Sequence, residues 1–214
     1  MNAERLSGVA NLEDACTFLS GVFTELPAEE MVQAVLNAQM SFDAENTAAE
    51  AGDAAESELA AWADGARRIP AEEAVLQIAR DRVVLMRGIY EDRILPPYES
   101  MWNVGGSANI GEVTRFYTEA GFAPTGQVHD APDQLGLELA FVAALLGQER
   151  EALSRGETEA ADECAAIRVR FAREHVETWA PAYAQEMRAQ ARTGFYRAVA
   201  CMVSDVVYRL GTFE

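Results

Sequence analysis

Apolar residues recur every three or four positions through most of the chain, which is the spacing of amphipathic helices. The segments with this pattern are 12–23, 28–40, 46–65, 71–86, 110–120, 132–153, 157–178 and 195–210. Apolar and polar residues do not alternate over any useful length, as they would in a strand, and no motif repeats at a fixed period. The pattern predicts an all-α fold, in which residues 1–214 form a single domain of about eight to ten helices.

Residues with strong positional preferences predict where several of these helices begin. Asn11 can cap the first helix, with Asp14 three residues later as in a capping box. Pro27 and Pro70 suit the first turn of the helices that follow them, because a helix start leaves its N–H groups unpaired and proline has none. The segment 132–153 is apolar almost all round in its first half, which predicts a central buried helix.

Two stretches, 88–108 and 121–131, interrupt the helical pattern. Irregular connections of about twenty residues are uncommon inside compact domains and often have a function. We therefore expect binding residues in these stretches. Either stretch can also serve as a hinge between N- and C-terminal helical parts.

The first interruption contains 93-RILPPYESMWNVGGS-107. Pro96 and Pro97 fix two φ angles, so the connection is stiff. Three large side chains with apolar surfaces follow: Tyr98, Met101 and Trp102. Such residues either contact the apolar surface of a partner or hold the loop against its own helices, and the sequence leaves both interpretations open.

The charge balance narrows the choice of partner. With 17 basic and 35 acidic residues the formal net charge is −18, which disfavours nucleic acid and anionic membrane surfaces. It favours a basic partner, or it serves solubility alone. No segment approaches the ~20 apolar residues of a membrane helix, so we expect no stable membrane insertion.

Cysteine usage and the N-terminal residues predict a cytoplasmic protein. Cys16, Cys164 and Cys201 are far apart and form no C-x-x-C pair, as expected of reduced thiols. The first twenty residues contain no apolar run typical of a signal peptide. The pair Arg67-Arg68 is internal and is not an export signal.

Catalytic motifs are absent from the sequence: there is no phosphate-binding loop, no dinucleotide fingerprint and no nucleophile elbow. His175 with Glu174 and Glu138 lacks the repeated Glu-x-x-His of helical metal sites, so we predict neither a metal nor a cofactor. We predict that the protein is not an enzyme. The alternative is a helical enzyme or nucleotide-binding protein that uses Ser100, His129 or Glu138.

The start of the long central helix also has two interpretations. Pro132 and Asp133 are residues that any helix start favours. Alternatively, an exposed Asp133 offers its carboxylate to an arginine of a partner. His175 and Trp179 lie four residues apart and should pack from one helix face into the core.

Three motifs in series resemble the TorD/DmsD/NarJ family of redox-enzyme maturation chaperones. They read 96-PPYESMW-102, 132-PDQLGLELAFVAALL-146 and 171-FAREHVETWAP-181. The resemblance implies a cytoplasmic, TorD-like helical bundle that binds the twin-arginine leader of a molybdopterin-containing oxidoreductase, or its apo catalytic subunit, until the cofactor is inserted. It also implies a monomer or a domain-swapped dimer. A purely structural subunit is the remaining alternative.

The resemblance also implies a peptide-binding surface. Its residues would be Pro97, Tyr98, Glu99, Ser100, Trp102, Pro132, Asp133 and Gln134. We expect Glu99 and Asp133 to be exposed beside an apolar groove, where they can bind the arginines of a leader. Gln134 replaces the histidine that is usual in the family. Glu138, Leu139 and Phe141 match its E-L-x-F pattern, and we expect these three to be structural.

Overall fold

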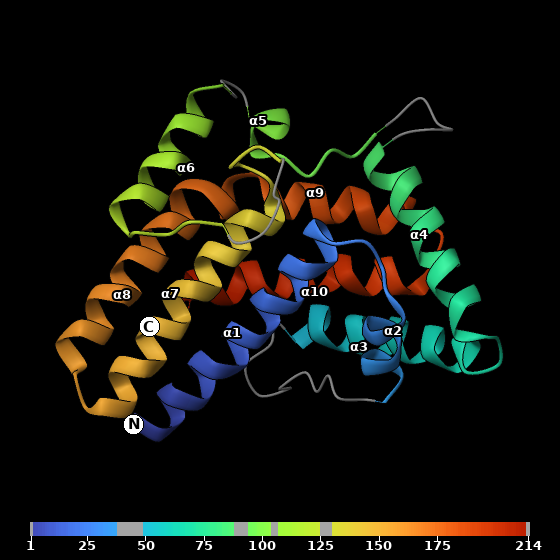
Figure 1. Cartoon of the computed structure of the whole chain (residues 1–214), viewed down its shortest axis with the longest axis horizontal. Coiled ribbons are helices and arrows are strands. Elements are labelled where there is room, and N and C mark those ends of the chain that lie inside the picture. The colour runs from blue at the N-terminus through green and yellow to red at the C-terminus, as the bar shows by residue number, and fades with distance from the viewer. Residues whose placement is uncertain (1, 38–48, 88–93, 104–106, 125–129, 213–214) are drawn as a thin grey trace. The chain divides into compact units, whose positions relative to one another are not determined.

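The computed structural model describes residues 2–37, 49–87, 94–103, 107–124 and 130–212 (Figure 1). These residues are mainly helical, and among them the extended pairing is an isolated antiparallel bridge between Tyr98 and Gln134. The predicted all-α fold is confirmed. Within the described ranges, no helix is both long and apolar enough to cross a membrane.

The chain divides into two compact units, each assembled from separate stretches of sequence. The first comprises Met1–Thr24, Tyr98–Ala180 and Val206–Glu214, and the second comprises Glu25–Pro97 and Pro181–Asp205. The single domain with a hinge in 88–108 or 121–131 stays a prediction, as does the oligomeric state.

The first unit is built around α7. Its helices are α1 (Asn2–Thr24), α5 (Glu99–Trp102), α6 (Ser107–Glu119), α7 (Leu135–Arg155), α8 (Thr158–Phe171) and the π-helix η1 (Ala172–Val176). Figure 1 shows α1 lying along α7, and α7 also packs against α8. Most residues in the first half of α7 are buried, as the apolar pattern of 132–153 predicts.

The second unit contains α2 (Glu29–Leu36), α3 (Ala49–Ala66), α4 (Ala71–Arg87) and parts of α9 (Glu177–Gln190) and α10 (Gly194–Thr212). Buried Asp81 of α4 accepts hydrogen bonds from the backbone N–H of Thr193 at 2.7 Å and of Arg192 at 3.1 Å. These bonds satisfy donors where α10 begins.

Several helix boundaries differ from the prediction. Helix α1 begins at Asn2 rather than after Asn11. The residues before Asn11 include good helix formers, and Arg5 binds Glu149 at 2.9 Å, which holds this first part of the helix against α7. The single helix expected over 157–178 is divided into α8, η1 and the start of α9, and α9 continues through Pro181 to Gln190.

Aromatic side chains form the core beside the candidate site. Phe116 and Tyr117 of α6 contact Phe171 of α8, with ring centroids 5.3 and 6.1 Å apart. Phe141 of α7 lies 4.8 Å from Phe171 and 4.9 Å from Tyr117. The imidazole of His175 packs on this cluster, 5.0 Å from the ring of Phe171.

Candidate functional site

The one-turn helix α5 begins on a side chain from a distant part of the sequence. The backbone N–H of Ser100 donates to Asp133 Oδ2 at 2.8 Å, and the N–H of Glu99 donates to the carbonyl of Asp133 at 2.9 Å. A four-residue helix is unstable by itself, because few of its N–H groups find partners inside it. Asp133 thus supplies the acceptors that α5 lacks.

The turn Asp130–Gln134, which we call the P-D turn, is fixed from the other side by Gln134. The Oε1 atom of Gln134 accepts from the N–H of Leu137 at 3.2 Å and caps α7. Its Nε2 atom donates to the carbonyl of Phe23, at the end of α1, at 3.0 Å. Gln134, where the resemblance leads us to expect a histidine, therefore serves as a structural residue.

Two tyrosines complete the contacts of the P-D turn. The hydroxyl of Tyr98 donates to Asp130 Oδ1 at 2.7 Å. The hydroxyl of Tyr117 donates to the carbonyl of Pro132 at 2.9 Å. With the bridge between Tyr98 and Gln134, these bonds join the P-D turn to Tyr98–Asn103, which we call the recognition segment.

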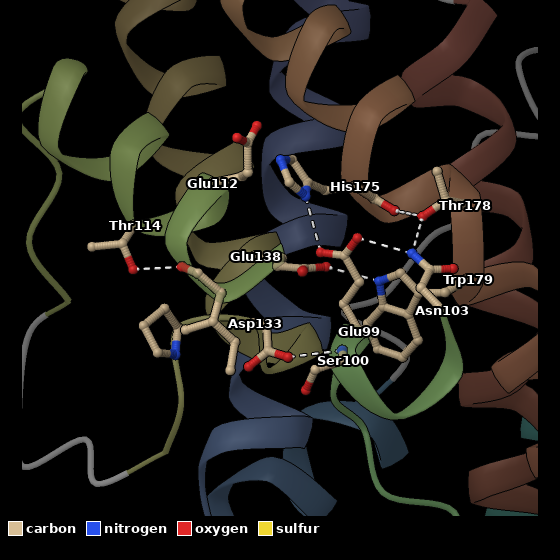
Figure 2. A network of polar contacts seen from close by, with 12 residues as sticks. Glu99, Ser100, Asn103, Glu112, Thr114, Asp133, Glu138, His175, Thr178 and Trp179 are labelled. Atoms are coloured by element: carbon tan, nitrogen blue, oxygen red, sulfur yellow. Dashed lines mark hydrogen bonds and ion pairs between the residues drawn. The ribbon is translucent and has the colours of Figure 1, made fainter. Parts of the chain in front are cut away.

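The carboxylate of Glu99 lies at the centre of a polar network (Figure 2). Its Oε2 atom is 2.9 Å from Nδ1 of His175, and its Oε1 atom accepts from Nδ2 of Asn103 at 2.9 Å. We assign His175 Nδ1 as the donor because a carboxylate oxygen can only accept. Asn103 also donates to Oγ1 of Thr178 at 2.8 Å, so η1 and α9 hold both ends of the recognition segment.

A second buried carboxyl group, that of Glu138, lies beside Glu99. Trp179 Nε1 donates to Glu138 Oε2 at 3.3 Å, and the carboxyl group of Glu99 lies next to that of Glu138 (Figure 2). Burial and the neighbouring charge of Glu99 raise the pKa of Glu138 well above its usual range. Burial, together with Glu138, Asp133 and Glu99, also raises the pKa of Tyr117.

The prediction that Glu99 and Asp133 are exposed is wrong. Their exposed fractions are 1% and 0%, because the amides of α5 bind Asp133 while His175 and Asn103 bind Glu99. The accessible part of the recognition segment is apolar instead. Met101 is 65% exposed, and Trp102 is partly exposed.

The remaining predicted residues differ in exposure and in the unit to which they belong. Tyr98, Ser100 and Pro132 are partly exposed in the first unit, whereas Pro97 is a buried residue of the second unit. His129, from the alternative enzyme site, lies outside the described residues. The described residues contain no group of His, Cys, Asp and Glu that could hold a metal ion, and Glu174 is exposed.

Sequence reasoning treated His175 and Trp179 as core residues and missed their hydrogen bonds to acids. Both are buried as predicted, with exposed fractions of 4% and 1%. Their four-residue spacing directs both toward the start of α7, and the pairing of His175 with Glu99 and Trp179 with Glu138 follows from that direction. Glu99 of the PPYES motif and Glu138 of the E-L motif were the residues in the sequence that could have indicated these hydrogen bonds.

Among curated protein sequences, none matches the chain. The sequence model of the family described as nitrate reductase delta subunit matches residues 45–185, well over half of the chain, and this range includes the recognition segment, the P-D turn and η1. The chain belongs to the nitrate reductase delta subunit family, a family of redox-enzyme maturation chaperones that work with molybdoenzyme catalytic subunits and are not themselves enzymes.

Proposed function

We propose that this chaperone binds the twin-arginine leader or the apo form of a molybdopterin-containing oxidoreductase in the cytoplasm, and assists its folding and cofactor insertion. The binding surface consists of the recognition segment and the P-D turn. The observation that best supports this proposal is the bond from Ser100 N–H to Asp133 Oδ2, because it joins two separate family motifs into one structure.

Apolar contacts would supply most of the affinity. A leader places an apolar run beside its arginines, and Met101 with Trp102 offers apolar surface on a short helix that is held at both ends. Met adapts to varied apolar side chains, and Trp provides a large contact area with few rotatable bonds. The buried bonds of Glu99 keep this surface in place before the peptide arrives.

The arginines of the leader need an accessible carboxylate. Buried Glu99 and Asp133 do not provide one, but Asp130 of the P-D turn is partly exposed and holds the hydroxyl of Tyr98. We therefore assign the arginine contact to Asp130. An exposed pair of this kind contributes about 0.2–1 kcal/mol, so it would set the register of the peptide more than its affinity.

The test is a titration with synthetic peptides that carry the twin-arginine leaders of molybdopterin oxidoreductases encoded in the same genome. We expect saturable binding of at least one peptide, and at least tenfold weaker binding after Trp102→Ala. Tyr208→Ala is the matched control, because Tyr208 is an exposed aromatic residue of the same unit, 54% exposed, that lies far from both motifs in sequence. Failure of every leader and every apoenzyme to bind would overturn the proposal.

The arginine contact needs a separate test. Asp130→Asn and a leader with both arginines changed to glutamine form a double-mutant cycle. We expect the two changes to be less than additive, because each removes the same ion pair. Full additivity would exclude Asp130 as the partner of the arginines.

A further inference from the structure

The carboxyl groups of Glu99 and Glu138 lie next to each other inside the core (Figure 2). An ionised carboxylate carries no hydrogen and can only accept, so these two groups can bond to each other only when one of them is protonated. Their exposed fractions are 1% and 0%, which leaves no room for solvent to separate two negative charges.

The same helix contains a buried carboxylate whose charge is neutralised differently. Glu149 of α7 is also 0% exposed, but it accepts from Arg5 at 2.9 Å and from Arg168 at 3.3 Å. Two guanidinium groups compensate its charge. Helix α7 thus contains one buried acid paired with arginines and another, Glu138, that faces an acid.

The surroundings assign the proton to Glu138. Both oxygens of Glu99 already accept hydrogen bonds, from His175 Nδ1 and from Asn103 Nδ2, each at 2.9 Å. Glu138 accepts only a longer bond, 3.3 Å, from Trp179, and its Oε1 atom is buried with no hydrogen-bond partner.

Further titratable groups face this pair from the neighbouring elements. Asp133 of the P-D turn and Tyr117 of α6 lie near Glu138, and neither side chain can supply a positive charge to it. His175 of η1 faces Glu99. The remaining charged residues of α6 and η1 with described surroundings are exposed: Glu112, Arg115, Glu119, Arg173 and Glu174. Burial raises the pKa of Glu138 accordingly.

We propose that Glu138 holds a proton at neutral pH and donates it to Glu99, and that this hydrogen bond keeps the recognition segment docked on α7 and η1. His175 is a positioning residue, which orients Glu99 to accept the bond. Loss of the proton would place two anions in contact inside the core. Their repulsion is relieved most simply when Glu99, at the first turn of α5, moves out to water and takes Met101 and Trp102 with it.

One consequence of this inference, a peptide affinity that depends on pH, rests on the proposed function. The docking of the recognition segment does not. The docking itself is tested without peptide, by hydrogen exchange at the amides of Glu99 and Ser100 in the full chain, corrected for the intrinsic rate. Between about pH 5 and about pH 8 we expect the opening constant to rise, by up to about tenfold per pH unit, because the closed state holds one more proton.

Two variants separate this mechanism from general destabilisation. Glu138→Gln keeps a donor toward Glu99 but cannot ionise, so the opening constant should become independent of pH. Glu149→Gln removes a buried carboxylate of the same helix and should leave the pH dependence as in the wild type. A wild-type opening constant that is flat over this range, or an unchanged slope in Glu138→Gln, would overturn the inference.

A spectroscopic measurement keeps the inference testable if Glu138→Gln does not fold. The infrared spectrum of the wild-type protein at pH 7 should contain the carbonyl band of a protonated carboxylic acid, which disappears in alkali. Absence of this band would overturn the inference. A failure of leader peptides to bind would instead overturn the proposed function and leave the proton unaffected.

Discussion

At the scale of single residues, Asp133 lies between two family motifs and serves the fold. Its Oδ2 atom accepts from Ser100 at 2.8 Å, and its side chain is fully buried. Ser100 lies in the other motif, so sequence spacing alone could not identify this pair. The sequence shows that Asp133 suits the start of a helix. It does not show that the side chain of Asp133 caps α5 rather than the helix that follows it in sequence.

Asp133→Ala should therefore lower the free energy of unfolding, by about 1–3 kcal/mol, because the partly buried Ser100 N–H loses its acceptor. Urea unfolding at pH 7 measures the change. Asp162→Ala is the control: this carboxylate is 62% exposed and pairs with Arg5 at 2.7 Å, so its loss should cost at most about 1 kcal/mol. Weaker peptide binding with unchanged stability would instead support an exposed arginine-binding role for Asp133.

At the scale of helices, the start of α7 is pressed against the end of α1. A Cβ atom added at Gly136 would lie 2.8 Å from Thr24 Cγ2 and 2.9 Å from Phe23 Cβ. Distances this short force the two helices apart or displace Gln134, whose Oε1 would also lie 2.8 Å away. Gly136 is needed for close approach, and the P-D turn depends on it.

Gly136→Ala should destabilise the protein even though alanine is the better helix former by about 1 kcal/mol. Gly21→Ala in α1 is the matched control, because a Cβ there meets nothing within 4 Å. We expect opposite signs in thermal unfolding, with a lower Tm for Gly136→Ala and an equal or higher Tm for Gly21→Ala. Equal shifts in the two variants would show that the packing of α1 on α7 does not limit stability.

The sequence predicts long helices better than short or irregular ones. Periodicity and Pro70 place α4 correctly, and the all-round apolar pattern identifies α7 as buried. It does not reveal α5, because four residues are too few for a helical period. The π-helix η1 is also missed, because the sequence pattern predicts one continuous helix over 157–178 and five residues are too few to show a separate period.

At the scale of the whole molecule, the stability of the chain should fall as pH rises. The pKa of Glu138 is raised in the folded state and ordinary in the unfolded chain. Between those two values the folded protein holds the extra proton, so the free energy of unfolding decreases by up to about 1.4 kcal/mol per pH unit. The stabilisation is complete below the ordinary pKa and is lost as pH approaches the raised one.

Urea unfolding of wild type and Glu138→Gln at several pH values measures this contribution. The difference in slope between the two proteins isolates Glu138 from the other 34 acidic residues among the 35 that the sequence contains. We expect the slope of the variant to be more positive throughout the window. Parallel curves for the two proteins would show that Glu138 has the same pKa in both states.

Because the net charge is −18, we expect the affinity for a leader peptide to depend on salt concentration. A leader with two arginines approaches an acidic protein favourably, and this long-range attraction is screened by salt. The Debye length falls from about 10 Å at 0.1 M salt to about 3 Å at 1 M, so the Kd should rise over this range, through slower association. The contacts of Met101 and Trp102 are apolar and should persist.

The control peptide has both arginines replaced by glutamine. It should bind more weakly than the native leader in low salt and nearly as well in high salt, because only the apolar contacts remain there. Stopped-flow fluorescence measures the association and dissociation rates of both peptides separately. A salt effect confined to dissociation would place the arginines in a buried pair, and one equal for the two peptides would show that the arginines do not take part in it. Either result would contradict their assignment to the accessible carboxylate of Asp130.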